Sequence, residues 1–174
     1  MKLHGLFLLW LLFVGARPAA IDYTTIDDGT CRFSFPVSYQ TNIEGDVAMY
    51  SKEVGDITFD VHRFFTGSVL VSSSTAAPAS VATPNQQSQL FVQMLQQATG
   101  GQIISQSAVT KNGREGTEVE VNYPEPGTDQ TTKMYVQYFW NGRRMYAFSV
   151  ASSLNNSAAL ADARTTLFNS ISFY

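Results

Sequence analysis

The 174-residue sequence predicts an α+β fold, with an antiparallel β-sheet of about six to seven strands and two main helices packed on it. Short segments of alternating apolar and polar residues are separated by turns, and two of these turns contain Asn-Gly, which favours tight β-hairpins. Two longer segments repeat apolar residues at helical spacing. Strands joined as hairpins form antiparallel sheets, and each amphipathic helix needs a sheet face to cover its apolar side.

The first twenty residues differ in composition from the rest of the chain. A basic residue precedes an unbroken apolar run over residues 6–14, as in a secretory signal peptide. The run is much shorter than the roughly 20 apolar residues that span a bilayer. We therefore expect residues 1–20 to be a signal peptide, cleaved after Ala16 or Ala20, and residues 21–174 to form a single exported domain, either periplasmic or secreted. An uncleaved membrane anchor is the alternative.

The chain is acidic, with 11 Lys plus Arg against 14 Asp plus Glu and a net charge of −3. Loss of Lys2 and Arg17 with the leader would reduce the basic residues from 11 to 9, so the net charge would become −5. Nucleic acid and anionic membranes attract basic stretches, which this sequence lacks. We expect no nucleic-acid partner, no stable membrane insertion after removal of the leader, and no cofactor.

The first predicted strand covers residues 29–35, with Cys31, Phe33 and Phe35 on one side. Pro36 ends it because proline cannot donate a hydrogen bond to a neighbouring strand. Cys31 is the only cysteine, so an intrachain disulfide is excluded and stability must come from an ordinary core. Its core-facing position favours a buried apolar side chain over a reactive thiol.

A hairpin is predicted from residues 46–52 and 57–63, with its turn at Val54-Gly55. The predicted register gives an apolar row closed by opposite charges: Tyr50 with Phe59, Ala48 with Val61 and Asp46 with Arg63. Asp60 and His62 lie on the other face of this hairpin.

Two helices are predicted, the first after a loop of small uncharged residues at 67–82. This helix begins at Pro84 and ends at Gly100, and the second covers residues 157–168. The predicted apolar stripes are Leu90, Phe91, Met94, Leu95 and Ala98 in the first helix, and Leu160, Ala163, Leu167 and Phe168 in the second.

The segment YVQYFWNGRRMYAFSVAS, residues 135–152, combines many aromatic residues with two arginines around Asn141-Gly142. A turn at Asn-Gly predicts these cross-strand pairs: Trp140 with Arg143, Tyr138 with Met145, Phe139 with Arg144 and Gln137 with Tyr146. The rings are thereby divided between two sheet faces, which indicates a core. Trp140, Arg143 and Arg144 at the tip are the candidate protein interface, because Trp and Arg are enriched at binding hot spots.

Several motifs occur in a characteristic order: Phe-x-Phe-Pro (Phe33, Phe35, Pro36), Gly-x-Glu-hydrophobic (Gly116, Glu118, Val119), Asn-Gly-Arg-x-x-Tyr-x-Phe-x-Val (residues 141–150) and a final Ser-Ile-Ser-Phe. This order resembles the Mog1/PsbP-like group, including its bacterial PsbP-related members, over most of residues 29–173. The resemblance implies an α/β/α sandwich and a role in binding or assembly. Val37-Ser38-Tyr39 departs from the aromatic residue expected after the first proline, and no site residue is carried over.

Catalytic and metal-binding residues are few. His62 is the only histidine after the leader, and Asp60 shares its strand face, so the two could supply ligands or an acid–base pair. The spacing indicates no third ligand, which favours a simple polar pair. In the acidic run Glu115, Glu118, Glu120 and Glu125, we expect Glu118 and Glu120 to share a solvated face rather than to bind a cation.

Three functional hypotheses follow. The first is a non-catalytic exported binding or assembly factor that contacts another protein through hairpin tips and loops, including the Pro-containing loop at 122–132. The second is a small hydrolase or metal-dependent enzyme that uses Asp60 and His62. The third is a secreted protein on the same fold that interacts with a host or another surface.

Overall fold

The computed structural model describes residues 20–45, 47–65, 84–125, 127–153 and 157–174. The predicted leader up to residue 19 and the predicted loop at 67–82 lie outside the described residues. The elements are, in order, β1 (Tyr23–Asp27), β2 (Cys31–Pro36), β3 (Gln40–Glu44), β4 (Val47–Val54), β5 (Ile57–Phe65), α2 (Pro84–Thr99), β6 (Gln102–Lys111), β7 (Arg114–Pro124), β8 (Thr131–Asn141), β9 (Arg144–Ser152), α3 (Ser157–Ser170) and β10 (Ser172–Phe173).

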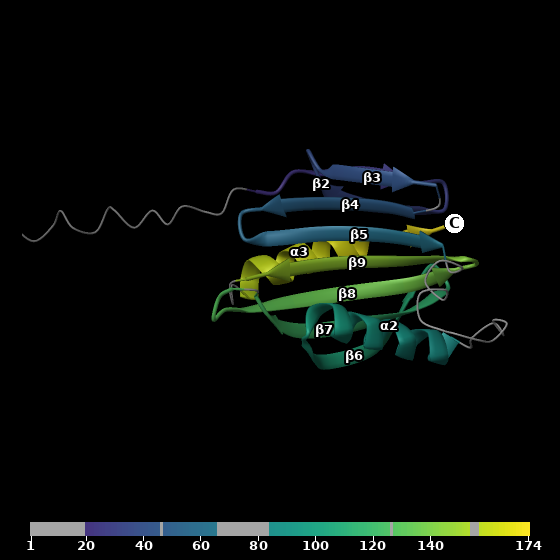
Figure 1. Ribbon diagram of the computed structural model, residues 1–174. Coiled ribbons are helices and arrows are strands. Elements are labelled where there is room, and N and C mark those ends of the chain that lie inside the picture. The colour runs from purple at the N-terminus through teal and green to yellow at the C-terminus, as the bar shows by residue number, and fades with distance from the viewer. Residues whose placement is uncertain (1–19, 46, 66–83, 126, 154–156) are drawn as a thin grey trace, which may run out of the picture.

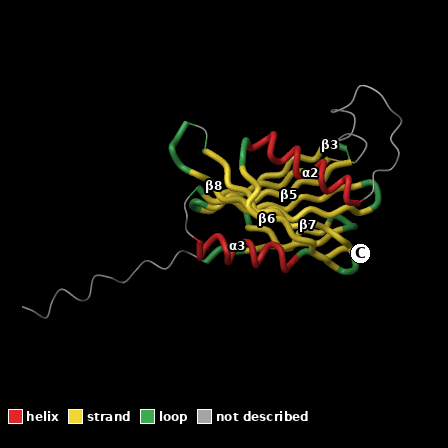
Figure 2. Tube along the Cα trace, turned by 90° about the horizontal axis from the view of Figure 1, so that it is seen from below, coloured by secondary structure: helices red, strands yellow, loops and turns green. Residues whose placement is uncertain are grey.

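Seven antiparallel strands form the main sheet in the order β3-β4-β5-β9-β8-β7-β6 (Figure 1). Helix α2 lies on one face of this sheet and α3 on the other, and Figure 2 shows the two helices on opposite sides. We call these the α2 face and the α3 face. A second sheet, β1-β2-β10, packs beside α3. The predicted α+β class and α/β/α arrangement are confirmed, whereas the three-stranded sheet was not anticipated.

Two predicted hairpin registers are wrong by two residues. The first hairpin turns at Gly55-Asp56, with Val54 opposite Ile57 and Tyr50 opposite Val61. The β8–β9 hairpin turns at Gly142-Arg143, so Trp140 faces Met145 and Phe139 faces Tyr146. In each turn glycine takes the first central position with positive φ, 59° at Gly55 and 63° at Gly142. Because a shift of two residues preserves the strand period, every side chain stays on its predicted face.

The β6–β7 turn at Asn112-Gly113 is confirmed, with φ of 49° and 76° at its two central residues. Arg63, which was expected to pair with Asp46, instead lies opposite Ala48 and forms an ion pair with Asp28. Asp46 itself lies outside the described residues. The partner of Arg63 is therefore a carboxylate in the β1–β2 turn, which the sequence of the hairpin alone does not indicate.

The stripe of α3 is confirmed, since Leu160, Ala163, Leu167 and Phe168 are all buried. The stripe of α2 is rotated from the prediction, because Phe91 is buried whereas Leu90 is 39% exposed and Ala98 is also exposed. Ser88 lies on the inner side of α2 and bonds to the Tyr138 hydroxyl. A buried tyrosine hydroxyl needs such a partner, and the observed rotation of the helix provides one.

Each sheet face carries its own core. The α3 face packs an aromatic cluster from both sheets, and Phe33, Phe35, Phe59, Tyr146 and Phe148 are each at most 1% exposed. The α2 face packs a smaller cluster around Phe91, Val119, Val121, Val136, Tyr138 and Met145. Among the described residues, neither helix has the length and apolar character that a membrane crossing requires.

Candidate functional site

Four cationic residues gather where the β6–β7 and β8–β9 hairpins end. Lys111 lies opposite Arg114 across the first turn, Arg143 is in the second turn, and Arg144 begins β9. In the β7–β8 pairing, Gly116 lies opposite Phe139. Two residues closer to the turns, Arg114 is therefore level with Asn141. Asn141 is in turn the cross-strand partner of Arg144. We call Lys111, Arg114, Arg143 and Arg144 the basic end.

The strand period places Lys111, Arg114 and Arg144 on the α3 face of the sheet. Arg114 and Arg143 are exposed, whereas Lys111 and Arg144 are half-buried. Within the described part of the chain, Lys111, Arg114 and Arg143 form no ion pair. These three residues therefore place positive charge at the hairpin tips of a protein whose net charge is −3.

Trp140 belongs to the α2 face and is half-buried against the core there. Its indole Nε1 is buried and has no hydrogen-bond partner. Its cross-strand neighbour is Met145 and not Arg143, so the predicted pairing of Trp140 with Arg143 is wrong. The structure brings Arg143 and Arg144 together at the tip, whereas much of the Trp140 ring contributes to packing.

Asp60 and His62 share the α2 face, as predicted, with Ser149 and Ala147 as their neighbours on β9. Burial raises the pKa of Asp60, while the nearby His62 opposes this shift. Burial also lowers the pKa of His62, which keeps the imidazole neutral at neutral pH. His62 stacks on Phe64 with ring centroids 5.5 Å apart, and no hydrogen bond joins it to Asp60. The geometry is that of a half-buried polar pair.

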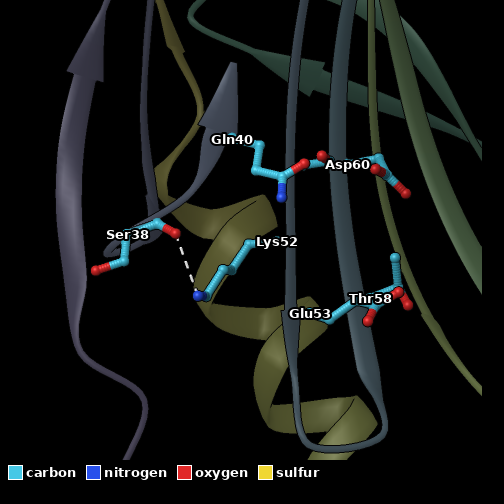
Figure 3. Close-up of a pocket in the computed structure, with 7 residues that line it drawn as sticks. Ser38, Gln40, Lys52, Glu53, Thr58 and Asp60 are labelled. Carbon is cyan, nitrogen blue, oxygen red and sulfur yellow. Dashed lines mark hydrogen bonds between the residues drawn. The ribbon is translucent and has the colours of Figure 1, made fainter.

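A polar pocket of about 480 Å³ opens beside Asp60, at the edge formed by β3, β4 and β5 (Figure 3). Ser38, Gln40, Ser51, Lys52, Glu53, Thr58 and Asp60 line it. The Lys52 ammonium donates to the carbonyl oxygen of Ser38 at 3.2 Å. Among the described residues, no group of three or more His, Cys, Asp or Glu side chains could hold a metal ion. His62 does not line this pocket.

Cys31 is fully buried, in agreement with its predicted role as an apolar core residue. Burial raises the pKa of its thiol, and the neighbouring Asp28 raises it further. The thiolate is therefore disfavoured, and a buried thiol of this kind is chemically inert.

Glu118 departs from its predicted place on a solvated face. Its side chain is only 11% exposed, because α3 covers it and Arg164 forms an ion pair with it. Glu120 is 20% exposed and pairs with Lys133 at 3.0 Å. The predicted alternation of Glu118 and Glu120 with Val119 and Val121 is confirmed, since both valines are fully buried on the other face of the sheet. Sequence patterns carried no signal for the helix that covers Glu118.

The architecture defines a class of protein: an antiparallel sheet sandwiched between helices. Among solved structures, this chain has the fold of the Mog1 and PsbP proteins. PsbP from the cyanobacterium Synechocystis superposes with a TM-score of 0.57 at 13% identity, over 92% of this chain and 96% of PsbP. The Ran-binding protein Mog1p from Saccharomyces cerevisiae gives a TM-score of 0.53 at 11% identity, over 88% of this chain and 96% of Mog1p.

LpqN, involved in cell envelope biogenesis in Mycobacterium tuberculosis, gives a TM-score of 0.54 at 13% identity, over 87% of this chain and 90% of LpqN. No family model matches the sequence, and no curated protein matches it. At identities this low the similarity is one of fold. The Mog1/PsbP-like resemblance predicted from motif order is therefore confirmed at the level of fold.

Proposed function

We propose that this protein is an exported, non-catalytic binding or assembly factor, periplasmic or secreted, that contacts another protein through its basic end. The observation that carries the proposal is the convergence of Lys111, Arg114, Arg143 and Arg144 from two neighbouring hairpin tips of an acidic protein. The fold supports the proposal, since the similar Mog1p is a Ran-binding protein.

The expected partner surface is acidic. Opposite charges speed the encounter of two proteins and set their orientation, and salt weakens both effects. Arginine adds bidentate hydrogen bonds to carboxylates, so Arg114 and Arg143 are the residues expected to contribute most to specificity. Trp140 lies beside this surface, but its packing against the α2-face core makes it a poor test residue.

The test is co-purification from the native host with the tagged mature protein. A protein that binds the wild type at low salt is expected to be lost when Arg114→Glu and Arg143→Glu are combined. Lys52→Glu is the matched control, because it reverses one cation on β4, away from the hairpin tips. Retention of the partner by the double variant, or an equal loss in Lys52→Glu, would contradict the proposal.

The two alternative hypotheses, a surface-binding protein and an enzyme, are distinguished by different observations. A secreted protein that binds a host or other surface would also use the basic end, and only the source of the captured partner would differ. An enzyme built on Asp60 and His62 would require His62 to approach a proton donor or acceptor when substrate binds. Loss of a measured activity in His62→Ala, with an unchanged melting temperature, would favour the enzyme.

A further inference from the structure

The two edge strands of the seven-stranded sheet differ in how they are protected from other chains. β3 and β6 are its terminal strands, and in the described part of the chain no strand pairs with the outer side of either (Figure 1). An unpaired edge exposes backbone N–H and C=O groups, and proteins usually protect it with charges, proline or a short strand. β3 has only five residues and ends at Glu44, whereas β6 has ten residues.

The sequence of β6 lacks most of these protections. Residues 102–110 contain no charged residue, no proline and no glycine, and Lys111 is the single charge of the strand. Seven of its ten residues are exposed. Its pairing with β7 shifts at a bulge between Ile103 and Ser105, and a bulge disturbs strand pairing locally. Residues 105–111 therefore form a regular, exposed edge with its only charge at the end.

The helix beside this edge is uncharged as well. α2 contains no acidic or basic residue, and it contacts β7, the strand next to β6. A surface helix normally presents charged residues to solvent, but the exposed side of α2 carries glutamines and Leu90, which is 39% exposed. Ile104 on β6 is 46% exposed. We call the following residues the neutral edge: Gln89, Leu90, Gln93 and Gln97 of α2 with residues 104–110 of β6.

The absence of charge favours a second copy of this chain as the occupant of the neutral edge. Two copies repel each other, because each has a net charge of −3, and an uncharged contact surface adds no further repulsion. A two-fold axis places the residues of a surface close to their own counterparts, so a strand that pairs with itself must keep charges away from the axis. β6 meets this condition because Lys111 lies at its end.

We propose that two copies of this protein pair antiparallel through residues 105–111 of β6, so that their two main sheets join into one continuous sheet. The two α2 helices then lie on the same face, one on each side of the new strand pair. Each copy contributes its single β6 edge, so the assembly closes as a dimer.

The proposed dimer leaves the basic end of each copy accessible. Lys111 is the last residue of β6, and antiparallel strands place their last residues at opposite ends of the pair. Pairing therefore does not rest on the proposed function at the basic end. It would give the dimer two partner sites instead of one, which raises the avidity for a partner that can contact both.

The first test is sedimentation equilibrium of the mature protein from about 1 μM to about 1 mM, the range in which weak dimers dissociate. The double variant Gln106→Lys with Ser107→Lys brings like charges together near the axis, and it is expected to raise the dimer dissociation constant about tenfold. Thr41→Lys with Asn42→Lys is the matched control, because these exposed residues lie on β3, the opposite edge. A monomer at every concentration, or an equal effect of both double variants, would overturn the proposal.

The second test does not depend on the folding of the lysine variants. A spin label is attached at Ser107→Cys, and labelling is confined to this site because Cys31 is fully buried. In the proposed dimer, the two labels are expected within about 25 Å of each other. The same label at Thr41→Cys is expected at about 60 Å, since β3 lies at the far edge of each sheet. Ser107 labels farther apart than Thr41 labels would show that the copies pair elsewhere.

Discussion

Replacement of Asp28 by alanine is expected to lower the free energy of unfolding by about 4 kcal/mol. The Asp28 side chain is 7% exposed, and its Oδ2 forms an ion pair with Nη1 of Arg63 at 3.0 Å. The Tyr146 hydroxyl donates to the same oxygen at 3.0 Å. Arg63 is itself only 12% exposed, so the alanine variant leaves a mostly buried cation without this carboxylate.

The other oxygen of Asp28 holds the β1–β2 turn together. It accepts from the backbone N–H of Thr30 at 3.0 Å, from the Thr30 hydroxyl at 2.9 Å and from the backbone N–H of Cys31 at 2.8 Å. Removing one member of a buried ion pair costs about 3–5 kcal/mol, and an orphaned buried donor costs about 1–3 kcal/mol. These costs overlap because the turn can relax, which gives the expected 4 kcal/mol as an order of magnitude.

Equilibrium urea unfolding measures this change, with Asp27→Ala as the matched control. Asp27 is the adjacent carboxylate and accepts from Gly29 and Tyr174, but these bonds are exposed to solvent. A large fall in the midpoint is expected for Asp28→Ala and a much smaller one for Asp27→Ala, with similar slopes. Equal midpoints in the two variants would refute the reasoning.

The same carboxylate predicts a pH dependence. Burial opposes ionisation of Asp28, but hydrogen bonds from Cys31, Thr30 and Tyr146 outweigh it and lower its pKa below the ordinary 3.8. A lowered pKa in the folded state means that the unfolded state binds the proton more tightly. The stabilisation is therefore complete above pH 3.8 and is lost as the pH falls through the folded-state value. Asp28→Asn should lack this acid-induced loss.

Three further predictions use single substitutions or reagents. Gly116→Ala is expected to destabilise the protein by about 1–3 kcal/mol, because an added Cβ would lie 2.5 Å from the Tyr138 carbonyl oxygen. Thermal unfolding measures this change, and an unchanged melting temperature would show that the strands can separate there. Cys31 is expected to react with an aromatic disulfide reagent only as fast as the protein unfolds, since it is fully buried; rapid labelling of the native protein would contradict this. Burial raises the pKa of Asp60, so its ionised form lowers stability as the pH rises from 3.8 through the folded-state value. Asp60→Asn should therefore melt higher than the wild type at pH 7 and lose this advantage near pH 3, and a lower melting temperature at both pH values would count against it.

The strand and helix positions followed from local patterns to a large extent. Alternation correctly placed Cys31, Phe33 and Phe35 in the core, and the apolar spacing of α3 predicted its buried stripe. The hairpin errors were also local, since the Asn-Gly rule favoured Asn141-Gly142 whereas the chain turns at Gly142-Arg143. The observed turn needs positive φ at its first central position, and Gly142 provides it there.

The candidate sites were less predictable. Arg143 and Arg144 were identified from their turn, but Lys111 and Arg114 join them only because β7 pairs with β8. The contacts of Glu118 with Gln137 and Arg164 were not predicted, because Gln137 lies in the middle of an aromatic strand whose pattern indicates a core. Glu118 and Arg164 are also distant from each other in sequence.

The sequence by itself therefore determined the α+β class, the two amphipathic helices and the face on which the residues of the predicted strands lie, because these depend on periods of two and 3.6 residues within one element. Only the tertiary structure decided how charges and polar groups are combined. Arg63 meets Asp28 across 35 residues, and Arg164 meets Glu118 across 46. Such contacts depend on which strands and helices become neighbours, and residue spacing within one element carries no information about that.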